Sequence, residues 1–492
     1  MMKKLLYLLI CVTTPVGFTA CNKSFLEVVP LGSQVASSTS DYDKLMNSPD
    51  FYQSRFAGGW QEVVLMEDDL AAEDALFSTV SQHMTRLFQW QDVIYFPNDP
   101  YQRPPLLLSG LMTNQYQLNK IINEVMNSGG GTDEQKRSIR AEARATRAWS
   151  NFQLINLYAK PYQAATAGTD PGFPIITQTD ITATIFKRGT VQEMYDFIIR
   201  DLTEALPDLP VVPAIRTRMS KPAAEGLLGK IYLFMGRYSD ALPMLNAAFN
   251  DLGAGGATLY DYNLTLGTGG SFLPMDPNIG PAKGPGNSYI DLTESVLFKV
   301  YYNAGYNGNL YGNNGLVLTP QTAALFGASD LRLRLYTNKN PDGSLNPGGR
   351  LRKYGVKYTR YGLELSELYL LRAECKARLN DLPGAVADVE TLRQHRMPVA
   401  DAAVPAAVAD DQVALIKFMI EERIREFAME GYRWFDMRRL SVDPLFAGIT
   451  FTHTLYNKDG STSVFTLRQP NRLVMQLPYN YMQYNPGMSN NP

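Results

Sequence analysis

The sequence predicts a mostly α-helical fold, in which about four helix pairs form a curved scaffold and loop-rich segments with minor β structure are inserted into it. Three observations lead to this prediction. Two segments of similar pattern recur far apart in the chain, and further stretches space their apolar residues with a helical period. The segments between them are rich in glycine, asparagine, proline and aromatic residues, which is typical of ordered loops.

The two similar segments, residues 225–249 and 369–392, match the tetratricopeptide pattern of paired antiparallel helices. In the first segment, Gly229 and Ala241 are the small residues that let the two backbones approach closely, while apolar side chains fill the flanks. We therefore expect a helix pair in each segment. The other matching positions are Leu228, Tyr232, Leu245 and Ala248 in the first segment, and Ala373, Ala385, Val389 and Leu392 in the second.

Three further stretches, 133–158, 190–206 and 412–430, are predicted to be amphipathic helices. The first two begin with capping boxes, and Gly431 is the expected stop of the third. The capping pairs are Thr132 with Gln135 and Thr190 with Glu193; the inward residues of the third helix are Ile416, Ile420, Ile424 and Phe427.

Charged residues on these helices are interpreted as surface features. The arginines at 137, 140, 144 and 147 are expected to form a solvated or salt-bridged face, with a ligand-binding ladder as the less favoured alternative. The charged residues between Glu421 and Glu430 are expected to form ion pairs on the helix surface. Trp149 and Trp434 are assigned to the core.

The chain after the signal is expected to form a single domain, 21–492. Val296 to Tyr302 reads as a strand, and 456–467 reads as a hairpin that turns at Asp459 and Gly460. The turn is preferred there over a cation site built from Asn457 and Asp459. The expected parts are helical repeats at about 112–250 and 363–440, loop-rich insertions at about 50–110 and 251–362, and an irregular C-terminal segment at 441–492.

The N-terminus, residues 1–20, has the features of a signal peptide. Lys3 and Lys4 precede an apolar run that is too short to span a bilayer, and small residues lead to Cys21. A cut directly before a cysteine is typical of a bacterial lipoprotein, so Cys21 is the predicted lipidation site. The alternative is an ordinary secretory signal that happens to end at a cysteine.

Composition argues against several function classes. The formal net charge of −2 gives no excess of basic residues for nucleic-acid binding. Only 3 histidines are present, which disfavours metal or acid–base catalysis, and no nucleophile elbow, phosphate loop or zinc motif occurs. Cys375 lies in an apolar helical pattern and is expected to be a buried, inert thiol. We expect no catalytic residue and no metal ligand.

Binding is better supplied than catalysis, because the two loop-rich insertions are rich in aromatic residues. Aromatic rings offer apolar faces that match the C–H face of a sugar, and nearby amides and carboxylates can bond to its hydroxyls. For each aromatic residue, simple core packing is the competing interpretation. The candidate ligand-binding residues are Trp60, Trp90 and Tyr95 from the first insertion and Tyr301, Tyr306 and Tyr311 from the second.

Several motifs follow one another along nearly the whole chain, and their order resembles that of the SusD-like (RagB-like) lipoproteins of Bacteroidetes-type bacteria. The resemblance implies a nutrient-binding, non-enzymatic lipoprotein that is anchored to the outer membrane and faces the cell exterior. The motifs are FLEVVP at 25–30, AEARATRAWSNFQLINLYAKPY at 141–162, GFPI at 172–175, RGTVQEMYDFIIRDLTEALPDLP at 188–210, EERIREFAMEGYRWFDMRRL at 421–440 and NRLVMQLPYNYMQYNPGM at 471–488.

The same resemblance implies the partners. It predicts an oligosaccharide ligand, delivery to a SusC-like TonB-dependent transporter, and no bound nucleic acid. No cofactor is expected, although a structural cation such as calcium is left open. Asn22, Lys23 and Ser24 follow Cys21 where surface-exported lipoproteins of this kind often carry acidic residues. Export to the outer face is therefore expected from the resemblance and not from the signal.

Three alternatives remain. A member of the same family could bind a peptide, because family resemblance does not fix the ligand. A periplasmic tetratricopeptide lipoprotein that assembles other proteins would explain the lipidation signal and the repeats. A lipid-anchored glycoside hydrolase would need two carboxylates, which Glu67, Asp68 and Asp69 or Glu73 and Asp74 could supply.

Overall fold

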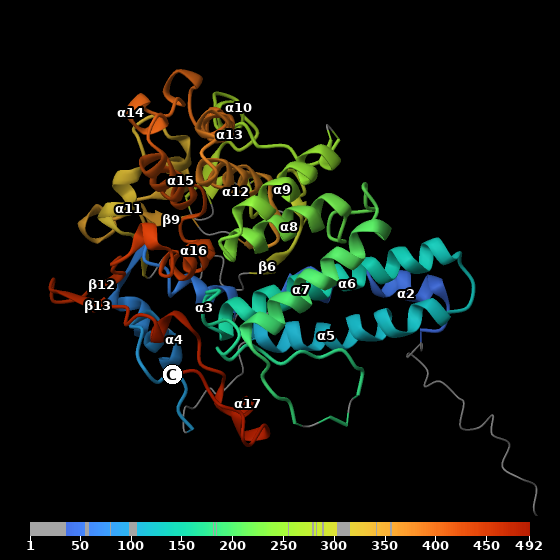
Figure 1. The fold of residues 1–492 in the computed structure, drawn as a ribbon. Helices are drawn as coiled ribbons and strands as arrows, with labels where there is room; N and C mark the ends of the chain where they lie inside the picture. The colour runs from blue at the N-terminus through green and yellow to red at the C-terminus, as the bar shows by residue number, and fades with distance from the viewer. Residues whose placement is uncertain are drawn as a thin grey trace, which may run out of the picture.

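The computed structural model describes residues 36–492 except 55–58, 79, 98–105, 181, 184, 254, 278–279, 282, 288–289, 303–314, 341 and 355–356, and it describes only the backbone at 59–61, 106–107 and 302. Long helices dominate this part of the chain and stack side by side (Figure 1). They pair as α5 (Leu106–Glu124) with α6 (Asp133–Tyr158), α8 (Lys221–Phe234) with α9 (Tyr238–Leu252), α12 (Leu365–Arg378) with α13 (Leu382–Gln394), and α15 (Gln412–Phe427) with α16 (Tyr432–Leu440). The predicted mostly α-helical repeat scaffold is confirmed.

The close approach of α8 and α9 has the predicted cause. A methyl group added at Gly229 would lie 2.6 Å from Cγ of Leu245, so only glycine fits between the two helices. Ala241 and Leu245 are fully buried on the α9 side. The equivalent small residues of the second pair, Ala373 on α12 and Ala385 on α13, are fully buried as well. Both segments therefore form the helix pairs that the repeat pattern predicts.

Helix α7 (Val191–Ala205) packs beside α6, and both helices begin with the predicted capping boxes. The arginine ladder of α6 faces this neighbour. Arg147 donates to both oxygens of Asp201 at 2.8 and 2.7 Å, and both side chains are buried. Arg137 pairs with Asp208 and Arg144 with Glu204. Three of the four arginines are therefore salt-bridged, as expected, and join α6 to α7 and to the 3-10 turn Leu206–Asp208 that follows it. Arg147 departs from the predicted surface face because it is buried.

The end of α15 differs from the prediction. Ile416, Ile420 and Phe427 are buried as expected, but the helix ends at Phe427 and not at Gly431. Met429 has a φ of 62° and Gly431 a φ of 95°, and Gly431 is the N-cap of α16. The glycine permits a left-handed backbone that redirects the chain into the next helix. It starts α16 and does not stop α15.

The expected surface ion pairs of α15 are also wrong for its central acids. The side chains of Glu422 and Glu426 are 0% and 6% exposed, and they accept hydrogen bonds from arginines of other segments. Arg332 donates to Glu422 at 2.6 Å and to Glu426 at 3.1 Å. Glu421 remains at the surface and pairs with Arg425. A sequence pattern of alternating charge cannot show that a neighbouring segment closes over it.

Strands in the described part of the chain form small sheets. The largest has the order β13–β12–β2–β7 and consists of β2 (Leu70–Glu73), β7 (Leu316–Leu318), β12 (Thr452–Tyr456) and β13 (Thr462–Thr466). The hairpin predicted at 456–467 is formed by β12 and β13, although its first strand begins earlier than predicted, at Thr452. Gly460 has the φ of 82° that its turn requires. The predicted strand 296–302 is divided into β5 (Ser295–Leu297) and β6 (Val300–Tyr302), which pair in different sheets.

The remaining elements are short. They are the helices α2 (Thr39–Leu45), α3 (Gly59–Val64), α4 (Gln82–Phe88), α10 (Tyr262–Thr265), α11 (Pro320–Leu325), α14 (Ala406–Ala409) and α17 (Tyr479–Tyr484), and the strands β1 (Gln53–Ser54), β3 (Met275–Asp276), β4 (Gly280–Pro281), β8 (Tyr336–Thr337), β9 (Arg352–Lys353), β10 (Tyr358–Arg360) and β11 (Leu363–Glu364).

Among the described residues, one large apolar cluster includes residues from Val63 to Leu477, and three smaller clusters lie apart from it. Trp149 and Trp434 lie in it, as predicted. Cys375 is fully buried on α12, as predicted, and burial raises the pKa of its thiol. None of the helices in the described part of the chain combines the length and the apolar character that crossing a bilayer requires.

Candidate ligand-binding cleft

Sheet pairing brings three distant segments together at one edge of the β13–β12–β2–β7 sheet. Strands β2 and β12 are parallel, with Glu73 opposite Tyr456, so their C-terminal ends lie side by side. Strand β7 is antiparallel to β2, so Gly315, directly before β7, lies at the same edge and accepts a hydrogen bond from the Glu73 N–H. Polar side chains at the ends of these strands therefore point into one place.

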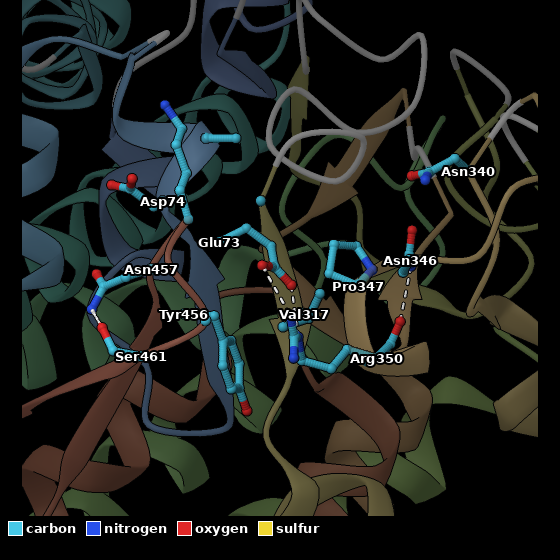
Figure 2. Close-up of a pocket in the computed structure, with 15 residues that line it drawn as sticks. Glu73, Asp74, Val317, Asn340, Asn346, Pro347, Arg350, Tyr456, Asn457 and Ser461 are labelled. Carbon is cyan, nitrogen blue, oxygen red and sulfur yellow. Dashed lines mark hydrogen bonds and ion pairs between the residues drawn. The ribbon is translucent and has the colours of Figure 1, made fainter.

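A cleft of about 560 Å³ opens at this edge (Figure 2). One wall is the segment that leads into β9, the opposite wall is the β12–β13 hairpin, and the strand ends lie between them. The lining residues are Glu73, Asp74, Ala75, Gly315, Val317, Asn340, Asn346, Pro347, Gly348, Arg350, Tyr456, Asn457, Lys458, Gly460 and Ser461. The size is that of a small-ligand site, and the lining is more polar than is usual for an apolar ligand.

Arg350 connects the two walls. Its Nε and Nη2 donate to the two carboxylate oxygens of Glu73 at 2.7 and 3.0 Å. Its guanidinium lies 3.7 Å from the centre of the Tyr456 ring. Figure 2 shows Glu73, Arg350 and Tyr456 beside one another in the cleft. The bidentate pair and the stacked cation fix the orientation of the Tyr456 ring.

The two walls carry the same turn. On one wall Asp342 accepts from the N–H and the hydroxyl of Ser344 at 2.9 and 2.6 Å. On the other wall Asp459 accepts from the N–H and the hydroxyl of Ser461 at the same distances. These hydrogen bonds hold the pKa of both aspartates below the usual value. Amide groups of Asn340 and Asn457 complete the pattern by donating to the serine hydroxyls.

The predicted ligand-binding residues do not form this cleft. Trp90 is 4% exposed, and its ring stacks on His453 with the ring centres 3.8 Å apart. Tyr301 is fully buried in β6. Both residues belong to the main apolar core, and a ring enclosed by protein has no face left for a ligand. For Trp90 and Tyr301, core packing therefore replaces the predicted role in ligand binding.

The other candidates are placed less directly. Tyr95 is half-buried on the loop after α4, and its ring stacks near His83, away from the cleft lining. Its hydroxyl is buried without a hydrogen-bond partner among the described residues. Trp60 belongs to α3, where the side chain is not described. Tyr306, Tyr311 and the predicted lipidation site Cys21 lie outside the described residues.

The acidic residues weighed as a hydrolase pair have structural partners. Glu67 accepts from the backbone N–H of Arg433, Asp68 pairs with the Arg433 side chain, and Asp69 accepts from the backbone N–H of Met429. Burial, together with the nearby charge of Asp68, raises the pKa of Asp69 to about 7. These acids attach the segment before β2 to the turn between α15 and α16.

Within the described residues, no group of three or more histidines, cysteines or acids is arranged to hold a metal ion. At 457–461 the structure has the predicted turn, with Asp459 bonded to Ser461.

One signal for the cleft was present in the sequence. The segments 338–344 (NKNPDGS) and 457–461 (NKDGS) share the residues Asn-Lys before an Asp-Gly-Ser turn. Their similarity indicates related turn chemistry at two places. Glu73, Arg350 and Tyr456 could not be joined to it from sequence, since only the strand pairing brings them together.

Comparison with known families agrees with this architecture. A family model described as "Starch-binding associating with outer membrane" matches residues 61–233. A second model, described as "SusD family", matches residues 292–492. The matched ranges include α5 to α7, α12 to α16 and both walls of the cleft.

Individual proteins are similar at low sequence identity. The SusD-like protein P2 of Formosa agariphila is 23% identical over 385 residues, which is 68% of this chain and 72% of that protein. The crystal structure of a SusD superfamily protein from Bacteroides thetaiotaomicron aligns with a TM-score of 0.67 at 18% identity, covering 92% of this chain and 100% of that one.

A laminarin-binding SusD-like protein aligns with a TM-score of 0.63 at 16% identity and covers 93% of this chain and 100% of its own. These structural likenesses concern the fold, whereas the two family models match the sequence itself. The chain belongs to the SusD/RagB-like family of carbohydrate-binding, outer-membrane-associated proteins.

Proposed function

We propose that this protein captures an oligosaccharide at the outer face of the outer membrane and delivers it to a SusC-like TonB-dependent transporter, without performing chemistry itself. The observation that carries the proposal is the cleft around Tyr456. It offers one oriented aromatic ring, flanking amides and hydroxyls, and enough volume for a few sugar units. This combination suits reversible binding of a hydroxyl-rich ligand.

The proposal that the protein is not an enzyme depends on whether the carboxylates of the cleft are free to act as a catalytic pair. Glu73 is the acid most directly in the cleft, and it is neutralised by the two hydrogen bonds from Arg350. A general acid or nucleophile of a glycosidase needs a carboxyl group free to reach the glycosidic bond. Asp74 also lines the cleft, but the described lining residues include no second free carboxylate that could act with it as a catalytic pair.

The binding test is a calorimetric titration of the purified protein against a panel of polysaccharides and peptides. Saturable binding of a glycan, weakened by Tyr456→Ala and unchanged by Tyr479→Ala on α17, would support the proposal. Tyr479 is the matched control because it is an exposed tyrosine outside the cleft. Saturable binding of a peptide in place of any glycan would favour a peptide-binding role in the same family.

The catalytic test follows from the same samples. We expect no reducing sugar to be released during prolonged incubation with the glycan that binds. Release that disappears in Asp74→Asn would replace the capture role with that of a lipid-anchored glycoside hydrolase.

The anchor and the partner need tests in cells. We expect labelled fatty acid to be incorporated into the protein and lost in Cys21→Ser. We also expect surface proteolysis of intact cells to remove the protein, and a barrel transporter to co-purify with it. Full protection from protease would instead favour a periplasmic assembly lipoprotein.

A further inference from the structure

We propose that the cleft selects a neutral glycan and discriminates against uronic-acid and sulfated chains. This inference rests on the proposed function, since it names the class of ligand for the same site. It starts from the charges that line the cleft. Among the described lining residues these are Glu73, Asp74, Arg350 and Lys458.

Arg350 is the cation best placed to bind an acidic sugar, but it is already engaged. Its Nε and Nη2 donate to Glu73. Its Nη1 lies against Gly348, because a methyl group added to that glycine would be 2.7 Å from Nη1. The opposite charge of Glu73 cancels that of Arg350 within the cleft. A carboxylate or sulfate entering the cleft would have to compete with Glu73 for a bidentate partner.

Asp74 supplies the discriminating charge. It lies directly after β2 on the cleft wall and is half-buried, and it has no hydrogen-bond or ion-pair partner among the described residues. A carboxylate in this state accepts hydrogen bonds from sugar hydroxyls. It repels a second anion at short range, and partial burial strengthens that repulsion relative to bulk water.

Lys458 does not reverse this preference. It is exposed on the turn of the β12–β13 hairpin, where a flexible ammonium group is strongly hydrated and its attraction is screened by salt. The polar groups that remain in the lining are neutral: the amides of Asn340, Asn346 and Asn457 and the hydroxyls of Tyr456 and Ser461.

The unengaged ionic groups of the lining are therefore one half-buried carboxylate and one exposed ammonium. Such a site favours hydroxyl groups over anionic substituents.

The test compares matched ligands. A panel of neutral polysaccharides, namely a β-1,3-glucan, starch, mannan, xylan and galactan, is titrated beside polygalacturonate, alginate and a sulfated galactan. The neutral glycan that binds is then oxidised at C6 to its uronate and titrated again. We expect the uronate to bind at least tenfold more weakly, with affinity for the neutral form independent of salt concentration.

The variant Asp74→Asn isolates the carboxylate. We expect the dissociation constants of the neutral glycan and its uronate to differ by less than threefold in this variant, chiefly because the uronate binds more tightly. Asp133→Asn is the matched control, because Asp133 is an exposed aspartate at the start of α6, and it should leave the ratio unchanged. Thermal melting of both variants verifies that they are folded.

The outcomes separate the inference from the proposed function. Binding of an acidic glycan as tight as that of any neutral one would overturn the inference but keep the capture role. An unchanged ratio in folded Asp74→Asn would also overturn it. If no glycan of either class binds, the proposed function itself fails, and the inference fails with it.

Discussion

Two regions of this molecule are built from arginine and glutamate, yet their surroundings give them different roles. Arg332 has a side chain 2% exposed and donates to Asp330, Glu422 and Glu426. Arg350 pairs with Glu73, but their side chains are 21% and 16% exposed, and the pair borders an open cleft beside Tyr456. Both arginines pair with carboxylates, but the first is enclosed by protein and the second is open to solvent.

The buried region acts as a connector. Around Glu422, three arginines from different segments converge: Arg332, Arg393 and Arg425. Burial alone would raise the pKa of Glu422, but these cations lower it to about 2. Each charge is needed to compensate the others, because an unpaired ion in the interior is costly. The network therefore joins α15 to α13 and to the segment after α11.

The difference in solvent access predicts how substitutions in the two regions will act. Substitutions in the buried network around Glu422 should strongly lower the free energy of unfolding. Substitutions of Arg350 or Tyr456 should change ligand binding and leave that free energy nearly unaltered.

The largest effect is expected for Glu422→Ala. It leaves Arg332, Arg393 and Arg425 without their shared carboxylate and should lower the free energy of unfolding by about 3–5 kcal/mol. Denaturant-induced unfolding measures it. The matched control is Glu421→Ala, whose side chain is 45% exposed and should cost less than about 1 kcal/mol. Equal losses of unfolding free energy in the two variants would contradict the distinction between the buried network and an exposed ion pair.

A second prediction concerns pH, through Asp69. Burial raises the pKa of this carboxyl in the folded state to about 7, above its usual value of 3.8. Its contribution to stability is therefore fully present below pH 3.8 and is lost as the pH rises through 7. We expect Asp69→Asn to be about 2–4 kcal/mol more stable than the wild type at pH 8 and equal to it at pH 4.

The measurement for Asp69 is denaturant unfolding of both proteins across this pH range. The carboxamide keeps an oxygen that can accept from the Met429 N–H, so the backbone contact is retained. A difference that does not change with pH would show that Asp69 is not buried as an acid.

The helix interface responds to volume and not to charge. Gly229→Ala places a methyl group against Leu245 and should lower the free energy of unfolding by about 1–3 kcal/mol. Gly110→Ala on α5 is the matched control, because nothing lies within 4 Å of its added methyl group. There the higher helix propensity of alanine should stabilise the protein by up to about 1 kcal/mol. The same sign in both variants would argue against the close approach of α8 and α9.

The smallest effect on stability is expected at the cleft. Arg350→Gln removes one partner of a partly exposed pair and should cost less than about 1 kcal/mol in unfolding free energy. Because the Tyr456 ring loses the cation that orients it, glycan affinity should fall about tenfold, which is ~1.4 kcal/mol. Thermal melting and calorimetry on the same samples separate the two effects. A large loss of stability would contradict this and would show that Arg350 stabilises the fold as Arg332 does.

The scaffold could be predicted from sequence because its signals are local. Gly229 and Ala241 lie within one helix pair, and Thr132 caps its own helix, so short spacing was enough. The buried role of Glu422 could not be predicted, because its partner Arg332 lies 90 residues away. Trp90 and Tyr456 are both aromatic residues near polar ones, and only the packing shows that the first faces the core.

The most direct test of the account is the dissociation constant of the best-binding glycan, measured by calorimetry for the wild type and for Tyr456→Ala. We expect at least tenfold weaker binding in the variant, with an unchanged melting temperature, because the ring lines the cleft and lies outside the main apolar core. Equal affinity in the folded variant would show that the glycan binds somewhere else, and would contradict the assignment of this cleft.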